Sequence, residues 1–154
     1  MGVFLLPLIS TAALSANAAS CPAAPASLKN IMVQHIVEIR ANEYCEARVF
    51  KASEGLSILI YTAEGACGKE KIETPGTCST NWVIYMVGEH QDVPIGPVVV
   101  GGKGFYEEKQ VSIFNGVVKI TGLTYGRSDP LCCPTIPAVK FFKVSDGRFV
   151  QVKP

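Results

Sequence analysis

Two adjacent cysteines, Cys132 and Cys133, are the side chains of this sequence best suited to chemistry. They lie in segment 129–134, which reads Asp-Pro-Leu-Cys-Cys-Pro. As free thiolates they could bind a soft metal such as copper(I) or exchange disulfides, although their spacing is not that of a C-x-x-C redox motif. The alternative is structural: prolines rigidify a crossover loop, and the cysteines staple it to a sheet. The even total of six cysteines favours the structural alternative.

Other chemical patterns are weaker. Glu89, His90 and Asp92 could form a metal or acid–base cluster, but no second histidine lies nearby in sequence, so a solvated loop is favoured. The glycines of 101–104 lack the Walker A spacing and predict a turn after a strand. His35 is interpreted as a core-edge residue. The sequence therefore predicts no catalytic residue, metal site or cofactor and favours a protein that is not an enzyme.

The cysteines together indicate how the chain is held. They are Cys21, Cys45, Cys67, Cys78, Cys132 and Cys133. In an oxidising compartment an even set predicts a disulfide framework. Cys67 and Cys78 bracket a short polar loop, so we expect them to be joined. Cys132 and Cys133 either bond to each other in a strained vicinal ring or take separate partners. Because successive side chains of an extended segment diverge, separate partners are favoured, and Cys21 and Cys45 remain as candidates.

The N-terminus predicts export. Residues 1–20 carry no charge, and the apolar stretch 3–14 is too short to span a bilayer comfortably. The small residues Ala16-Asn17-Ala18 predict a signal peptide at 1–18 and a single domain at 19–154. Ala18-Ala19-Ser20-Cys21 also resembles a lipoprotein box, which leaves a lipid anchor at Cys21 as an alternative. No later segment has about 18 consecutive apolar residues, so no membrane span is expected after cleavage, and the predicted location is periplasmic or secreted.

The charge balance excludes one class of partner. Fourteen basic and thirteen acidic residues give a formal charge of +1, and no run of Lys or Arg forms a stripe. Nucleic acid is therefore not an expected partner.

The apolar pattern predicts an α+β fold. Ser27 is a candidate N-cap for a helix of about three turns, whose apolar face would hold Leu28, Ile31, Met32, His35, Ile36 and Ile39. The β-branched content of this segment is also compatible with a strand. Short apolar runs at 47–52, 56–62, 82–87 and 98–100 then predict strands. The expected architecture is an N-terminal helix packed on a mostly antiparallel sheet built of hairpins and stapled by disulfides.

Two turns set the register of the C-terminal half. A type I′ turn at Asn115-Gly116 pairs Phe114 with Val117 and places Val111, Ile113, Val118 and Ile120 on one face, with Ser112 and Lys119 on the other. A second turn at Asp146-Gly147 joins 139–144 to 148–152. Apolar residues occur on both faces of this second hairpin, which predicts burial on both sides.

One segment carries a resemblance. The D-P-x-C-C-P segment at 129–134, preceded by Tyr125-Gly126, the glycines of 101–104 and the Asn115-Gly116 hairpin, resembles small bacterial envelope proteins such as lipoproteins of the LppP/LprE type. The resemblance covers about residues 82–150. It implies a periplasmic or surface location and a β-rich domain, and it transfers no catalytic residue.

The crossover loop 127–137 is the predicted recognition surface. Arg127 and Asp129 supply charge beside a backbone restricted by Pro130 and Pro134, and a rigid loop loses less entropy on binding. The alternative is that Asp129 only caps the turn. We therefore expect a non-enzymatic binding or inhibitor-type envelope protein, whose partner is an envelope or extracellular protein or a small ligand. The alternative function is thiol-redox or soft-metal handling by Cys132 and Cys133.

Overall fold

The computed structural model describes residues 21–65, 82–102, 107–130 and 133–153. They form one helix followed by eight antiparallel strands. The elements are α1(Ala26–Glu38), β1(Asn42–Ser53), β2(Leu56–Glu64), β3(Trp82–His90), β4(Val93–Gly102), β5(Glu107–Phe114), β6(Val117–Thr124), β7(Ile136–Ser145) and β8(Arg148–Val152). The predicted α+β class, with an N-terminal helix on antiparallel hairpins, is confirmed.

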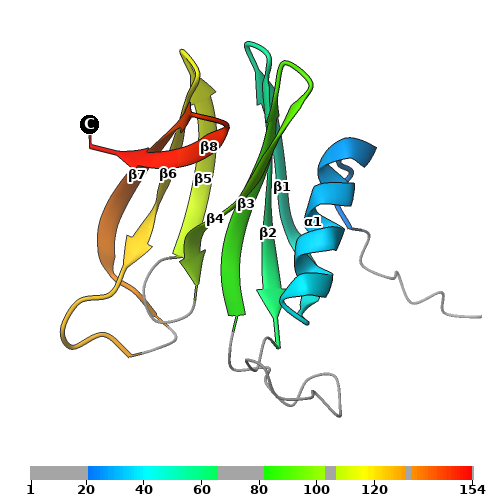
Figure 1. Cartoon of the computed structure of the whole chain (residues 1–154). Helices are drawn as coiled ribbons and strands as arrows, with labels where there is room; N and C mark the ends of the chain where they lie inside the picture. Colours follow the sequence, from blue (N-terminus) through cyan, green and yellow to red (C-terminus); the bar gives the residue numbers. More distant parts are fainter. Residues whose placement is uncertain (1–20, 66–81, 103–106, 131–132, 154) are drawn as a thin grey trace, which may run out of the picture.

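The strands form two sheets where the sequence predicted one. Sheet A has the order β1-β2-β3-β4 and sheet B the order β5-β6-β7-β8. The sheets stack, with β1 against β5 and β4 against β8, and α1 lies on the opposite side of sheet A (Figure 1). The layers are therefore helix, sheet A and sheet B.

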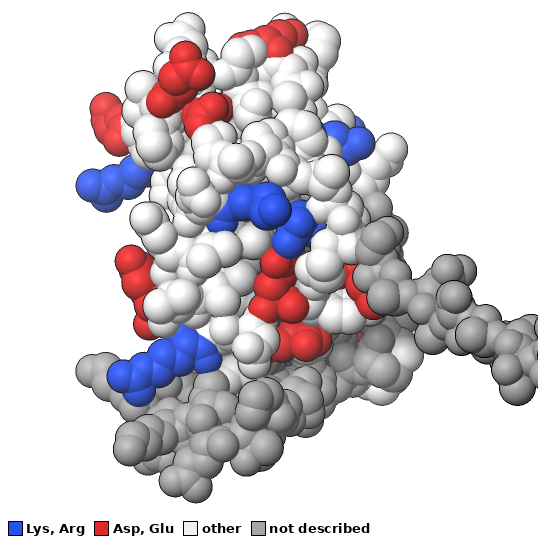
Figure 2. Space-filling view, turned by 90° about the vertical axis from the view of Figure 1, so that its right-hand side faces the viewer, with Lys and Arg blue, Asp and Glu red and all other residues white. Residues whose placement is uncertain are grey.

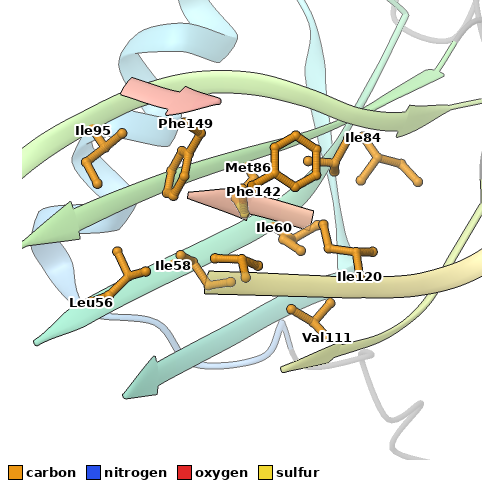
Figure 3. Close-up of a cluster of buried hydrophobic side chains, with 12 residues drawn as sticks. Leu56, Ile58, Ile60, Ile84, Met86, Ile95, Val111, Ile120, Phe142 and Phe149 are labelled. Atoms are coloured by element: carbon orange, nitrogen blue, oxygen red, sulfur yellow. The ribbon is translucent and has the colours of Figure 1, made fainter. Parts of the chain in front are cut away.

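The main core fills the space between the sheets. Alternate residues of each strand point inward. The buried side chains are Leu56, Ile58, Ile60, Ile84, Met86, Ile95 and Val100 from sheet A and Val111, Val118, Ile120, Phe142 and Phe149 from sheet B (Figure 3). They include three of the four residues that the alternation places on one face of the β5–β6 hairpin: Val111, Val118 and Ile120, of which the last two are fully buried.

A second cluster holds α1 on sheet A. Leu28 and Met32 are buried against Leu59, Tyr61 and Val87. Both helix residues belong to the predicted apolar face, one turn apart.

The helix begins differently from the prediction. It starts at Ala26, with Pro25 at the N-cap position and no side-chain cap, so the expected cap at Ser27 is wrong. Proline suits the start of a helix because it has no N–H to leave unpaired. Ser27 instead lies exposed in the first turn.

Both predicted hairpin turns are confirmed. Asn115 and Gly116 have φ of 49° and 69°, and Asp146 and Gly147 have φ of 50° and 70°, the positive values that a type I′ turn requires. Phe114 pairs with Val117 as predicted. The predicted burial of both faces of the second hairpin is wrong, because a two-layer stack of sheets covers only the inner face of sheet B.

A disulfide ties the segment before α1 to β1. It joins Cys21 to Cys45, whose Cα atoms are 5.1 Å apart, so the expectation that these cysteines pair with Cys132 and Cys133 is wrong. Cys133 is also disulfide-bonded. The predicted Cys67–Cys78 bond and Cys132 lie outside the described residues. Because a sulfur in a disulfide cannot also carry a lipid, the Cys21–Cys45 bond and a lipid anchor at Cys21 exclude each other.

Candidate binding face

The side of sheet B that points away from sheet A has an unusual composition. Its cross-strand rows follow from the register: Phe114, Val117, Lys143 and Val150 form one row, Ser112, Lys119, Phe141 and Val152 the next, and Gln110, Thr121 and Val139 a third. We call these eleven positions the outer face of sheet B. Six of them are apolar, although outward strand positions are usually polar.

Three of these apolar side chains are strongly exposed. The exposed fractions are 71% for Phe114, 49% for Val139 and 43% for Val150. The matching face of sheet A is covered by α1, whereas no described helix or strand packs on the outer face of sheet B (Figure 1). Exposed apolar side chains that are contiguous commonly mark interaction sites.

The charges at these eleven described positions are all of one sign. Lys119 and Lys143 are exposed on it, and Arg148 lies at its end, paired with Ser145. Among the outward positions whose side chains the structure describes, none is acidic; Asp146 lies beyond them in the β7–β8 turn. The α1 side of the molecule differs, since acidic and basic side chains are interspersed there (Figure 2).

The predicted recognition loop joins β6 to β7 at one end of this sheet. Arg127 and Pro130 are exposed and Pro134 is buried. The carboxylate of Asp129 accepts hydrogen bonds from the backbone N–H of Gly126 (2.8 Å) and of Thr135 (2.9 Å), and from the Thr135 hydroxyl (3.0 Å). Asp129 therefore links the two ends of the loop by hydrogen bonds, while the charged side chain of Arg127 is exposed to solvent.

Asp129 makes a testable contribution to stability. Its hydrogen bonds lower its pKa below the ordinary 3.8, the bond from Gly126 most of all. The folded state therefore favours the carboxylate, and this stabilisation is complete above 3.8 and is lost as pH falls through the folded-state pKa. We expect Asp129→Ala to lower the melting temperature at pH 7 and Arg127→Ala to leave it unchanged.

A double variant distinguishes the two roles of the loop. The melting temperature of Arg127→Ala/Asp129→Ala measures the contribution of the loop to the stability of the fold. Capture of the partner by the same variant measures the contribution of the loop to recognition. Unchanged capture by a protein of lowered melting temperature would mean that the loop serves the fold alone.

A histidine and two tyrosines form a cluster beneath α1. His35 Nδ1 lies 2.6 Å from the hydroxyl oxygen of Tyr61. The His35 ring meets that of Tyr85 edge-on with centroids 4.5 Å apart, and the two tyrosine rings are stacked. The sequence placed His35 at the core edge but could not identify Tyr61, which is 26 positions away, as its partner.

The cluster serves the docking of the helix. Burial lowers the pKa of His35 below 6.5, with Glu38 opposing this effect, and burial raises the pKa of Tyr61 well above 10. Both shifts favour the neutral side chains. We therefore interpret His35 as a packing residue whose ring is hydrogen-bonded to Tyr61, and not as a base.

We expect the stability of the fold to decrease in mild acid through His35. Since its pKa is lower in the folded state, its contribution is complete above 6.5 and is lost as pH falls from there through the folded-state pKa. Denaturant unfolding at pH 7.5 and 5 should show a smaller pH dependence for His35→Gln than for the wild type. His90→Gln is the matched control, and an equal reduction in that variant would contradict the assignment.

Two partly buried cations are held by structural contacts. Lys140 lies on the inward side of β7, and its Nζ donates to the carbonyl oxygen of Val100 (2.8 Å); burial lowers its pKa. Arg48 is paired with Glu43 and donates to the carbonyl oxygen of Pro22 (2.9 Å). Lys140 therefore joins sheet B to sheet A, and Arg48 joins β1 to the segment before α1.

The candidate cluster of Glu89, His90 and Asp92 lies at the β3–β4 turn. Glu89 and His90 end the strand on opposite faces, and Asp92 occupies the turn with φ of 63°. Within the described residues no three such side chains come close enough to hold a metal ion.

A hollow lies at the same end of the molecule. His90 borders it together with residues of both sheets, including Leu56, Val117 and Lys143, and its volume is about 300 Å³. That volume is at the lower limit for ligand pockets.

Comparison with known proteins adds no further assignment. No protein-family model, curated protein or solved structure matches the chain. The choice between candidate functions therefore depends on the chemistry of the faces and loops described above.

Proposed function

We propose that the chain is a secreted or periplasmic, non-enzymatic binding or inhibitor-type protein of the cell envelope. One observation carries this proposal: α1 covers the outer side of sheet A, whereas the outer face of sheet B exposes Phe114, Val139 and Val150. Burial of such side chains against a partner is favourable, at about 25 cal/mol per Å² of apolar surface.

The predicted leader and the Cys21–Cys45 disulfide support the proposed location. Disulfides persist in oxidising compartments such as the periplasm and the extracellular space. In the described part of the chain, no helix is long and apolar enough to cross a membrane. The resemblance of segment 129–134 to envelope proteins supports the same location.

The alternative function, thiol-redox or soft-metal chemistry at Cys132 and Cys133, requires a free thiolate. Cys133 is disulfide-bonded in the structure, which favours a structural use of that sulfur. Asp129 and His35 are likewise engaged in contacts that hold the loop and the helix.

Affinity capture from an envelope extract tests the proposal against this alternative. The exported protein is used as bait in two forms, untreated and with its thiols blocked by N-ethylmaleimide, each with and without a copper(I) chelator. A binding module should retain the same partner in all four conditions. Retention that is lost on thiol blocking or on chelation would contradict the proposal and support the thiol alternative.

A further inference from the structure

We propose that the outer face of sheet B is the docking surface for a protein that presents Asp and Glu side chains within an apolar patch. This inference rests on the proposed binding function and specifies the class of its partner. It follows from where the apolar and cationic side chains lie relative to each other.

The apolar part of the face is continuous across the strands. Phe114 and Val117 are cross-strand neighbours, and Phe141 and Val152 are neighbours in the next row. With strands about 4.8 Å apart and same-face residues about 6.8 Å apart along a strand, the eleven positions present roughly 360 Å². A standard interface covers about 800 Å² per partner, so this face would form about half of one and its flanking turns would supply the rest.

Lys143 lies within the apolar area, and Lys119 lies at its border with the polar positions. Lys143 stands between Val117 and Val150 in one row, and Lys119 stands between Ser112 and Phe141 in the next. A partner that covers the valines and phenylalanines also removes water from these ammonium groups. Because an unpaired buried charge is costly, a fitting partner must supply carboxylates among its apolar side chains.

This charge pattern argues against a second copy of the chain. A symmetric dimer through this face would place the same patch on both subunits. The eleven positions of the face offer two lysines and no carboxylate, so a dimer confined to these positions would leave each ammonium group without an opposite charge.

The charge pattern of this face also argues against a membrane surface as its partner. Lipid-binding surfaces insert apolar side chains below a level at which cations meet the headgroups. The face has only two lysines among its eleven positions, fewer than the roughly four to eight basic residues that typically mark a surface for anionic lipids. A protein surface can match such a mixture residue by residue.

Site-specific photo-crosslinking tests the inference in the full chain, exported from its native host with its own leader. The photoreactive residue p-benzoylphenylalanine replaces Val139 on the face, Val37 on α1, or Arg127 in the loop. Val37 is 70% exposed and provides the matched control on the opposite side of the molecule. The crosslinked peptide is then identified by mass spectrometry.

We expect a crosslink from position 139, but not from 37, to a peptide in which Asp or Glu lies beside apolar residues. Its yield should decrease at high ionic strength and decrease roughly tenfold or more in Lys119→Glu/Lys143→Glu. The control Lys29→Glu/Lys51→Glu, with the same change in net charge, should retain it.

Other outcomes separate the two proposals. Crosslinks from position 139 to phospholipid or to a second copy of the chain would overturn the inferred partner. A protein partner crosslinked only from 127 or 37 would overturn the inferred surface while leaving the binding function in place. Absence of any crosslink from all three positions would contradict both.

Discussion

Glu43→Ala is expected to lower the free energy of unfolding by about 2–3 kcal/mol, because it leaves the guanidinium of Arg48 without its carboxylate in a largely buried position. Arg48 donates from Nε to Glu43 Oε1 (2.7 Å) and from Nη2 to Oε2 (2.6 Å). The two side chains are only 7% and 15% exposed. The hydrogen bonds that Arg48 donates to Glu43 raise the pKa of Arg48. Arginine stays protonated in proteins even without such a partner, so the charge persists in the variant. Denaturant unfolding measures the change.

Two variants test whether the effect belongs to the unpaired charge. Glu46→Ala removes an exposed carboxylate from the same strand and should cost less than about 1 kcal/mol. Glu43→Ala/Arg48→Met removes both charges and should recover part of the loss, since replacement of a buried ion pair by apolar groups is often tolerated. A double variant less stable than Glu43→Ala would contradict this explanation.

The predictable parts of the fold are those that local chemistry determines. Asn115-Gly116 and Asp146-Gly147 adopt positive φ readily, and alternation then sets the register on either side of each turn. The turn at 54–55 uses the same backbone conformation, with φ of 53° and 77°, but its Glu-Gly pair is a weaker signal. The two hairpins were therefore predictable from their turns. The ends of the strands were less so, since β1 and β4 extend beyond the ranges 47–52 and 98–100 that the sequence predicted.

The division into two sheets and the disulfide pairing depend on distant contacts. Nothing near residues 103–106 in the sequence indicates that β4 and β5 belong to different sheets. Cys21 meets Cys45 because Leu28 and Met32 dock α1 on sheet A, which brings residue 21 to β1. Arg48 is similar: an irregularity in β1 between Tyr44 and Val49 accompanies its burial, and the strand pattern alone did not predict it.

The outer face of sheet B could not be predicted for the same reason, because its exposure depends on how distant segments pack. The apolar residues on both sides of 139–152 correctly marked two apolar faces, but the sequence could not show that only one has a cover within the chain. Phe142 and Phe149 face sheet A, whereas Val139 and Val150 face outward. The sequence directed attention to loop 127–137 instead, where Asp129 is engaged by Gly126 and Thr135.

Gly88 provides a test of how closely the two sheets pack. It lies buried in β3 and faces sheet B, where a Cβ atom would be 2.5 Å from Cζ of Phe149 and 3.0 Å from the carbonyl oxygen of Ser57. Phe149 is 7% exposed and packs in the main core, so its ring has little room to move. Gly88→Ala should therefore lower the free energy of unfolding by about 1–3 kcal/mol through overpacking.

Gly96 and Phe149 supply the controls for this steric explanation. Gly96→Ala, in the neighbouring strand, adds a methyl group with no atom within 4 Å and should have little effect. Phe149→Leu removes the ring atoms nearest to the new methyl group, so Gly88→Ala should cost less in that background than in the wild type, by a coupling of about 1 kcal/mol. Chemical unfolding of the four proteins of the cycle measures this coupling. Additive changes, or a Gly88→Ala effect no larger than that of Gly96→Ala, would mean that the β3–β8 contact can relax and that the sheets are less tightly joined at Phe149 than the distances indicate.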